Sequence, residues 1–293
     1  MNYTLENEFL TVGVSSYGGA LTSIRSKDGI EYLWQGDPAY WAKQAPLLFP
    51  ICGSIRDGHA MIGDHKETHM SRHGIVRTRE FTCEQQSDHA ITLSITADEE
   101  MKEQFPYAFK FSVTYELDGH SLRNIITVEN QDGERMPFFT GGHPAFNCPI
   151  VSGDDYTDYY VEFEKEETYS IPEQLLDSGL LNMQHRSALL DHTRRLPLSF
   201  DLFKNDSLVF DALASRSVKL ASDKHGHSVQ VDFADFPYLV LWTTANNGPF
   251  LAIEPWLGVS TCSDESDQFE DKRNVQFAEP GEKKSYCFTI TVA

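Results

Sequence analysis

Four segments of the sequence interrupt its regular patterning and place ionisable side chains beside glycine or proline. The candidates for proton transfer or for binding a polar ligand are Arg56 in residues 50–58, His73 in 71–77, His143 in 140–147 and Glu254 in 252–258. An imidazole exchanges a proton near neutral pH, and a carboxylate that closes an apolar strand is either solvated or buried with a shifted pKa. Together these residue types suit general acid–base catalysis, in which one group takes a proton while another gives one.

Each of these side chains also has an ordinary structural interpretation. His73 precedes a glycine and fits a turn histidine that satisfies local backbone groups. His143 precedes a proline, which holds the preceding residue extended and often begins a loop. Arg56 fits a surface cation in an Asp-Gly turn. The four segments taken together, rather than any one alone, indicate a functional site.

The elements that must position these residues follow a period of two. Apolar and polar residues alternate in several runs, at 91–95, 109–117, 229–233 and 286–292. Alternation of this kind places apolar side chains on one face of a sheet. Turn residues at 27–29 and 118–119 predict hairpins, the second of which joins 109–117 to 122–129.

Helical signal is scarce, with one short helix expected at 98–105 and a turn or two at 172–176. The carboxylates at 162–167 indicate a solvated strand edge or loop. No linker or fixed-period repeat divides the chain. The sequence therefore predicts an all-β protein, a large antiparallel β-sandwich formed by residues 1–293 as one domain.

Composition narrows the classes of partner. With 24 Lys+Arg against 44 Asp+Glu, the formal net charge is −20, which opposes binding to nucleic acids or anionic membranes. No apolar run is long enough to span a membrane, and the N-terminus has no signal-peptide pattern. Five widely spaced cysteines without a CxxC motif indicate reduced thiols, so we expect a cytoplasmic protein. We further expect a monomer or a homodimer.

Metal-dependent and other hydrolytic chemistries are disfavoured. His65, His69 and His73 recur every four residues, but along a strand they would span about 27 Å, too far for one ion. We therefore expect neither a metal nor a cofactor. Acidic composition alone does not support a glycosidase, and the sequence lacks both a GxSxG elbow and a nucleotide-binding glycine pattern.

The order of these motifs resembles the aldose 1-epimerase (galactose mutarotase-like) family. The resemblance rests on Gly-Ser-Ile-Arg at 53–56, Arg-His-Gly at 72–74, Gly-Gly-His-Pro-Ala-Phe-Asn at 141–147 and the late strand that ends in Glu254. It covers essentially the whole chain and is closest to the LacX-like branch, to which residues 210–218 are also similar. The family fold is a large antiparallel β-sandwich, which agrees with the period-two interpretation.

The resemblance implies a mechanism and a set of residues. Interconversion of α and β anomers requires a base that takes the C1 hydroxyl proton and an acid that protonates the ring oxygen. By resemblance, Glu254 is the general base and His143 the general acid, and the residues that contact the sugar are His73, Arg56, Asp211 and Trp256. Asp211 is the nearest match to the family's sugar-binding aspartate, and Trp256 is either a stacking face or a core residue. The sequence after Glu254 departs from the galactose enzymes, so the identity of the sugar stays open.

Two classes of function remain at this point. One is an aldose 1-epimerase that opens the ring of a hexose or related sugar. The other is a non-catalytic carbohydrate-binding or sensing protein, which would not need an acid–base set. A subsidiary enzyme hypothesis is a hexose-6-phosphate 1-epimerase, for which Arg72, Arg77 and Arg79 near His73 are candidate phosphate ligands.

Overall fold

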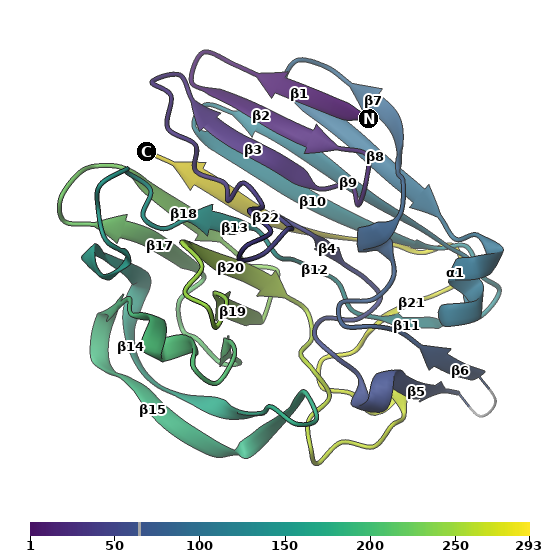
Figure 1. The fold of residues 1–293 in the computed structure, drawn as a ribbon. Helices are drawn as coiled ribbons and strands as arrows, with labels where there is room; N and C mark the ends of the chain where they lie inside the picture. The colour runs from purple at the N-terminus through teal and green to yellow at the C-terminus, as the bar shows by residue number, and fades with distance from the viewer. Residues whose placement is uncertain (64–65) are drawn as a thin grey trace.

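A computed structural model describes residues 1–63 and 66–293, and their regular secondary structure consists mainly of β-strands (Figure 1). The largest sheet has nine strands in the spatial order β15 (Leu180–Pro197), β14 (Tyr159–Leu175), β17 (Ser217–Ser222), β18 (Ser228–Asp232), β22 (Lys283–Val292), β10 (Ser121–Asn130), β9 (Phe109–Asp118), β8 (Ala90–Thr96) and β7 (Thr82–Gln86). Neighbouring strands of this sheet run antiparallel.

A second, six-stranded sheet carries the elements that matter for the site. Its order is β16 (Leu208–Phe210), β19 (Tyr238–Trp242), β20 (Phe250–Trp256), β12 (Gly141–Gly142) and β4 (Leu47–Leu48), and β13 (Ala145–Asn147) also pairs with β20. Smaller sheets are β1 (Asn2–Glu6), β2 (Leu10–Ser15) and β3 (Leu21–Ser26), the pair β11 (Met136–Phe138) and β21 (Gln276–Ala278), and the hairpin β5 (His59–Ile62) and β6 (Lys66–His69).

Helices contribute little to the part of the chain that the structure describes. The α-helix α1 (Glu99–Gln104) begins after Asp98, whose side chain accepts a hydrogen bond from the amide of Met101 at 2.8 Å. Short 3₁₀ turns are η1 (Arg56–Gly58), η2 (Val76–Thr78), η3 (Tyr156–Asp158), η4 (Phe200–Phe203) and η5 (Phe269–Asp271). None of the described helices is long and apolar enough to cross a membrane.

The six-stranded sheet packs against the nine-stranded one, so the two form a sandwich. The ring of Phe49, next to β4, lies 4.8 Å and 5.1 Å from the rings of Phe109 and Phe111 in β9. Gly142 in β12 approaches β22 so closely that a Cβ there would lie 2.6 Å from the ring of Phe288. This contact leaves no room for a side chain at 142, which explains the second glycine of the Gly-Gly-His motif. The all-β antiparallel sandwich predicted from the alternation is therefore confirmed.

Most of the predicted elements are present, with two corrections. The turn at 118–119 joins β9 to β10 as expected. Residues 172–175 lie in β14 rather than in a helical turn, because β14 and β15 form one long hairpin whose register shifts four times. Glu167 is not solvated: it is buried and accepts hydrogen bonds from the amide and hydroxyl of Ser215, each at 2.7 Å.

The five cysteines are unpaired, and Cys52, Cys148 and Cys262 are buried. Burial raises the pKa of the Cys52 thiol to about 12, so this thiol is protonated and unreactive at neutral pH.

Candidate active site

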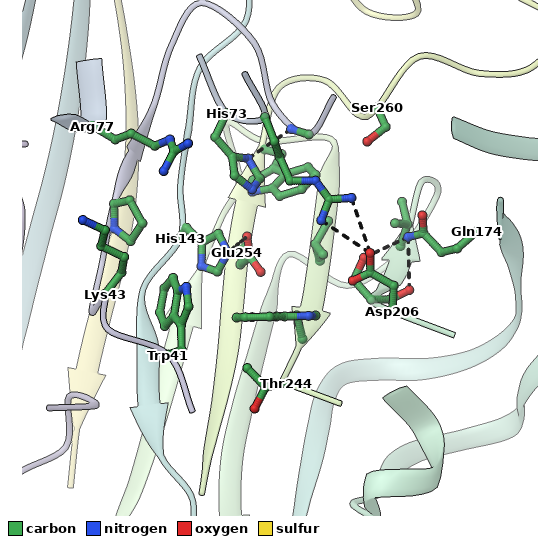
Figure 2. A pocket seen from close by; sticks show the side chains of 18 of the residues that line it. Trp41, Lys43, His73, Arg77, His143, Gln174, Asp206, Thr244, Glu254 and Ser260 are labelled. Atoms are coloured by element: carbon green, nitrogen blue, oxygen red, sulfur yellow. Dashed lines mark hydrogen bonds and ion pairs between the residues drawn. The ribbon is translucent and has the colours of Figure 1, made fainter. Parts of the chain in front are cut away.

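A cavity of about 310 Å³ lies against β19 and β20 of the six-stranded sheet, and Gln174 of β14 and Leu181 of β15 also line it (Figure 2). Pockets of about 300 Å³ and above are typical of small-molecule sites, and this one has room for a monosaccharide. Glu254, His143, His73 and Trp256 line it. The structure thus brings together four of the six residues that the sequence singled out.

Strand pairing places Glu254 in this cavity. Leu251 and Ile253 of β20 point into the sandwich core, so the alternation of a strand turns Glu254 and Trp256 to the opposite face. In the antiparallel register Glu254 lies opposite Val240 of β19, which also lines the cavity. Every residue of β20 is buried, so the carboxylate sits inside the strand rather than at a solvated end.

His143 lies in the short link between β12 and β13. Its amide donates to the carbonyl of Pro46 at 3.0 Å, which fixes the backbone. Its ring stacks on Trp41, with centroids 4.9 Å apart, and meets Trp242 edge-on at 5.5 Å. Both tryptophans line the cavity, so the imidazole is held in one orientation by aromatic surfaces.

The imidazole and the carboxylate face each other. Nε2 of His143 lies 3.2 Å from Oε2 of Glu254, and both side chains are almost completely buried. The angles at this contact are not those of a hydrogen bond, and Oε2 of Glu254, Nδ1 of His143 and Nε1 of Trp256 are all buried without a hydrogen-bond partner. Buried polar atoms are normally satisfied, so these atoms are free to bind water or the polar groups of a ligand in the cavity.

Burial controls the protonation of this pair. It raises the pKa of the Glu254 carboxyl well above its usual range, and the negative charge of Asp206 adds to the effect. It lowers the pKa of His143 to about 3, with a smaller contribution from the charges of Arg72 and Arg77. Burial therefore favours the neutral form of both groups, a protonated carboxyl on Glu254 and an uncharged imidazole on His143.

His73 presents a hydrogen-bond donor to the same cavity. Its Nδ1 accepts a hydrogen bond from the amide of Gly53 at 3.1 Å, so Nε2 carries the proton of the neutral ring. Burial lowers the pKa of His73 well below its usual value, and His143 adds to this effect, so the ring stays neutral. The backbone of His73 has a φ of +69°, and that of Gly74 has +75°. A Cβ on Gly74 would lie 2.1 Å from the carbonyl oxygen of Phe49, so the turn requires the glycine of the Arg-His-Gly motif.

Arg72 and Asp206 form a polar part of the cavity wall, and sequence reasoning did not identify Asp206. Nη1 and Nη2 of Arg72 each lie 3.4 Å from Oδ2 of Asp206, and Nε of Arg72 donates to Ser54 Oγ at 3.1 Å. Gln174 from β14 lies beside them and donates to Ser207 Oγ at 2.8 Å. Amide, carboxylate and guanidinium groups on one wall match the hydroxyl groups of a sugar.

Arg56 and Asp211 do not line the cavity. The guanidinium of Arg56 donates to the carbonyls of Cys262 and Glu265 at 3.3 and 3.0 Å and lies 3.3 Å from Asp267. Its hydrogen-bonding capacity is thus used to fix a loop. Arg72, from the neighbouring motif, is the arginine of these two segments that lines the cavity together with Arg77.

Asp211 takes part in a separate ion-pair network. It receives hydrogen bonds from Arg186 at 2.7 and 3.1 Å and from the hydroxyl of Tyr169. These contacts hold the carboxylate outside the cavity, and Asp206, five residues earlier, is the aspartate that faces it.

Trp256 belongs to the buried hydrophobic cluster and also lines the cavity, where its ring meets His73 edge-on at 5.4 Å. Trp41 and Trp242, which the sequence analysis did not select, join it there. Their signal in the sequence is weak, since a tryptophan is as common in a core as in a binding site.

One cluster among the described residues has metal-ligand character, and it lies far from this chemistry in the hairpin β5–β6. Ligand atoms of His59, Glu67 and His69 lie within 4.8 Å of one another at the surface. His69 and His73, which share a period of four in the sequence, do not form one site: His69 belongs to this surface cluster, whereas His73 lines the cavity. His65 lies outside the described residues.

The fold and the cavity place the chain among large antiparallel β-sandwich proteins that carry a small-molecule site on one sheet. Residues 1–275 match the family model for aldose 1-epimerase, and the chain belongs to this family. It is 46% identical to the plasmid-encoded protein LacX of Lactococcus lactis subsp. lactis, over 99% of both chains.

Two solved structures have the same fold. A galactose mutarotase related enzyme from Lactobacillus acidophilus is 30% identical, with a TM-score of 0.94 over 100% of this chain and 97% of that one. A galactose mutarotase-like protein from Lactobacillus casei is 29% identical, with a TM-score of 0.91 over the full length of both. The resemblance seen in the sequence motifs is confirmed over the whole chain.

Proposed function

We propose that the protein is an active aldose 1-epimerase, which interconverts the α and β anomers of a hexose or related sugar by opening and closing its ring. The observation that carries the proposal is the buried contact of 3.2 Å between Glu254 and His143, whose polar atoms lack partners inside a monosaccharide-sized cavity. A purely sugar-binding protein has no need for an adjacent acid and base of this kind. Family membership supports the same reaction.

In the proposed mechanism, the pair transfers protons at the anomeric centre. Glu254 as the base takes the proton of the C1 hydroxyl, and His143 as the acid protonates the ring oxygen, so the bond between C1 and that oxygen breaks. Rotation about C1–C2 turns the aldehyde, and the reverse transfers close the ring to the other anomer. The pair needs one proton in total, and burial favours the state in which Glu254 carries it. The hydroxyl groups of a bound sugar favour the charged state of the pair, in which Glu254 is ionised and His143 carries the proton. They do so because they supply hydrogen bonds that the dry cavity lacks.

The remaining walls hold the sugar. Nε2–H of His73 donates to a sugar oxygen near the reacting centre, while Arg72, Asp206 and Gln174 bind hydroxyl groups. Trp256 offers an aromatic face against the C–H groups of the ring. No step of this mechanism uses a metal or a cofactor. Cytoplasmic location, a single domain and a monomeric or homodimeric state are part of the proposal.

Polarimetry with freshly dissolved α-glucose and α-galactose tests the reaction, with Glu254→Gln as the key variant. The wild type should accelerate the approach to anomeric equilibrium, and the variant should lose about 10²- to 10⁴-fold of that acceleration while it still binds sugar. Glu167→Gln is the matched control, because Glu167 is a buried carboxylate outside the cavity. Wild-type turnover by Glu254→Gln would overturn the mechanism, and sugar binding without acceleration by the wild type would establish a sensor instead.

A further inference from the structure

Two cations on one side of the cavity have no role in the mechanism above. Lys43 and Arg77 line the cavity, and Figure 2 shows them together on the opposite side of Glu254 from Asp206 and Gln174. Within residues 1–63 and 66–293, neither forms an ion pair with a carboxylate. Unpaired cations that face a cavity need an explanation in a chain with 44 acidic and 24 basic residues.

Arg77 in particular lacks partners. Its Nε is buried with no hydrogen bond, and the guanidinium makes one long contact, from Nη2 to Ser71 Oγ at 3.5 Å. By contrast, Arg79 at the end of the same turn η2 binds both oxygens of Glu100, at 2.7 and 2.8 Å. A half-buried guanidinium with free donors is suited to bind the oxygens of an anion, which it contacts in pairs.

The local field on this side of the cavity is positive despite the overall charge. Burial raises the pKa of the Glu254 carboxyl, which favours its neutral form, and Asp206 is paired with Arg72. Arg77 is close enough to lower the pKa of both His73 and His143. More distant carboxylates are screened over about 8 Å at physiological ionic strength. An anion that enters here therefore meets two unneutralised cations rather than the acidic surface.

The order of groups in the cavity fits the order of atoms in a pyranose. With the C1 hydroxyl at Glu254 and the ring oxygen at His143, the next ring carbon and its exocyclic C6 continue past His143. Figure 2 shows Lys43 and Arg77 on this side of His143. Space continues there as well, because Lys43, Pro46 and Arg77 also line a neighbouring cavity of about 170 Å³.

We propose that the substrate is an aldose with an anionic group at C6, a sugar 6-phosphate or a uronate, and that Lys43 and Arg77 hold this group. The inference rests on the proposed epimerase function and names the substrate class of the same site. The phosphate ester and the carboxylate share the chemistry that the two cations recognise, and the experiment separates them.

The test measures the rate of interconversion of the two anomers by exchange NMR at equilibrium, a method that does not require a pure anomer. Substrates are glucose, glucose 6-phosphate and glucuronate, with the corresponding galactose series. The wild type should show kcat/KM for one anionic class about 10- to 100-fold above that for the parent sugar, as expected for charge-assisted hydrogen bonds. Arg77→Met and Lys43→Met should reduce this ratio by a similar factor. Arg79→Met, which removes a cation paired outside the cavity, is the matched control and should leave the ratio unchanged.

The outcomes separate this inference from the proposed function. If the wild type epimerises glucose or galactose without preference for either anion, and Arg77→Met has the same ratio, the anionic subsite is wrong and the epimerase stands. If no sugar is epimerised, the proposed function fails, and calorimetric titration with glucose 6-phosphate and glucuronate decides the subsite. Binding that is lost in Arg77→Met would support it, and absence of binding to the wild type would overturn it.

Discussion

Oε2 of Glu254 lies 3.2 Å from Nε2 of His143, yet the two groups belong to different parts of the sheet and reach each other only through strand pairing. Glu254 lies within β20, and His143 follows β12, whose Gly141 pairs with Trp256 of β20. The backbone of the sandwich therefore sets this contact, and no flexible loop has to close to form it. A preformed acid–base pair avoids reorganisation at the moment of proton transfer.

The pH dependence of kcat/KM should reflect a pair that shares one proton. Because burial lowers the pKa of His143 to about 3, kcat/KM should stay constant as pH falls through 6.5, where an ordinary histidine titrates. The pKa of Glu254 is raised, so activity should decline on the alkaline side as the pair loses its last proton. Rates measured from about pH 5 to 9, corrected for the spontaneous reaction, check this profile. An acidic limb centred near pH 6.5 would show that burial does not control the imidazole.

Substitutions at His73 should separate its two nitrogen atoms. An asparagine side chain at this position would still accept from the amide of Gly53 and tolerates the φ of +69°, but it has no donor at the position of Nε2. His73→Asn should therefore keep the thermal stability and lower kcat/KM by about 10- to 100-fold, mainly through KM, as expected for a lost substrate hydrogen bond.

His73→Gln is the complementary variant, because its amide places a donor near the position of Nε2 and gives up the contact with Gly53. We expect it to retain more of the binding and to lose stability. Equal KM values for the wild type and His73→Asn, measured by the same mutarotation assay, would remove His73 from the sugar contacts.

Much of the fold was predictable because burial in a sandwich alternates along each strand. The runs at 109–117 and 286–292 match β9 and β22 for this reason, and Asp98 marks the start of α1 because its side chain caps the helix. The hairpin β14–β15 was less predictable, since its register shifts move residues between faces and Pro172 resembles a helix start. Because each register shift interrupts the alternation of faces, no regular hydrophobic period marks this hairpin in the sequence.

The candidate site was predictable only where the backbone itself is unusual. His73 and His143 stand out because a glycine is required beside each of them, Gly74 for a turn with positive φ and Gly142 for close packing on β22. Asp206 and Arg72 are 134 residues apart, and nothing local marks them as partners. Arg56 was expected at the sugar because its Gly-Ser-Ile-Arg motif resembles the family, whereas in the structure it donates to loop carbonyls more than 200 residues along the chain.

Arg72→Met and Arg56→Met should have opposite consequences. Arg72 lines the cavity, so its loss should raise KM for the sugar about 10-fold or more with little effect on stability, because its contacts with Asp206 are long and exposed. Arg56 donates to two carbonyls, so its loss should lower the free energy of unfolding by about 1 to 3 kcal/mol and leave kcat and KM near wild type.

Parallel mutarotation kinetics and urea unfolding of the two variants measure both quantities. A KM defect in Arg56→Met that exceeds the one in Arg72→Met would return Arg56 to the sugar site.

Asp211→Asn should affect stability in a pH-dependent way. Burial favours the neutral carboxyl, but the hydrogen bonds from Arg186 and Tyr169 outweigh it, and the pKa of Asp211 is lowered in the folded state. A lowered pKa contributes stability above the unfolded value of 3.8, and this contribution disappears as pH falls through the folded pKa. At pH 7 the variant should therefore unfold at a lower urea concentration than the wild type, and the difference should shrink as the pH is reduced toward 3.8 and below.

The same variant also decides the role of Asp211 in binding. Because the carboxylate lies outside the cavity, KM for the sugar should not change, and Asp206→Asn, with the same chemistry inside the cavity, should raise it. Arg186→Met serves as the control for the network, since it removes the partner of Asp211 without touching the cavity and should reproduce the stability loss. A raised KM in Asp211→Asn at unchanged stability would place this aspartate at the sugar and contradict the network.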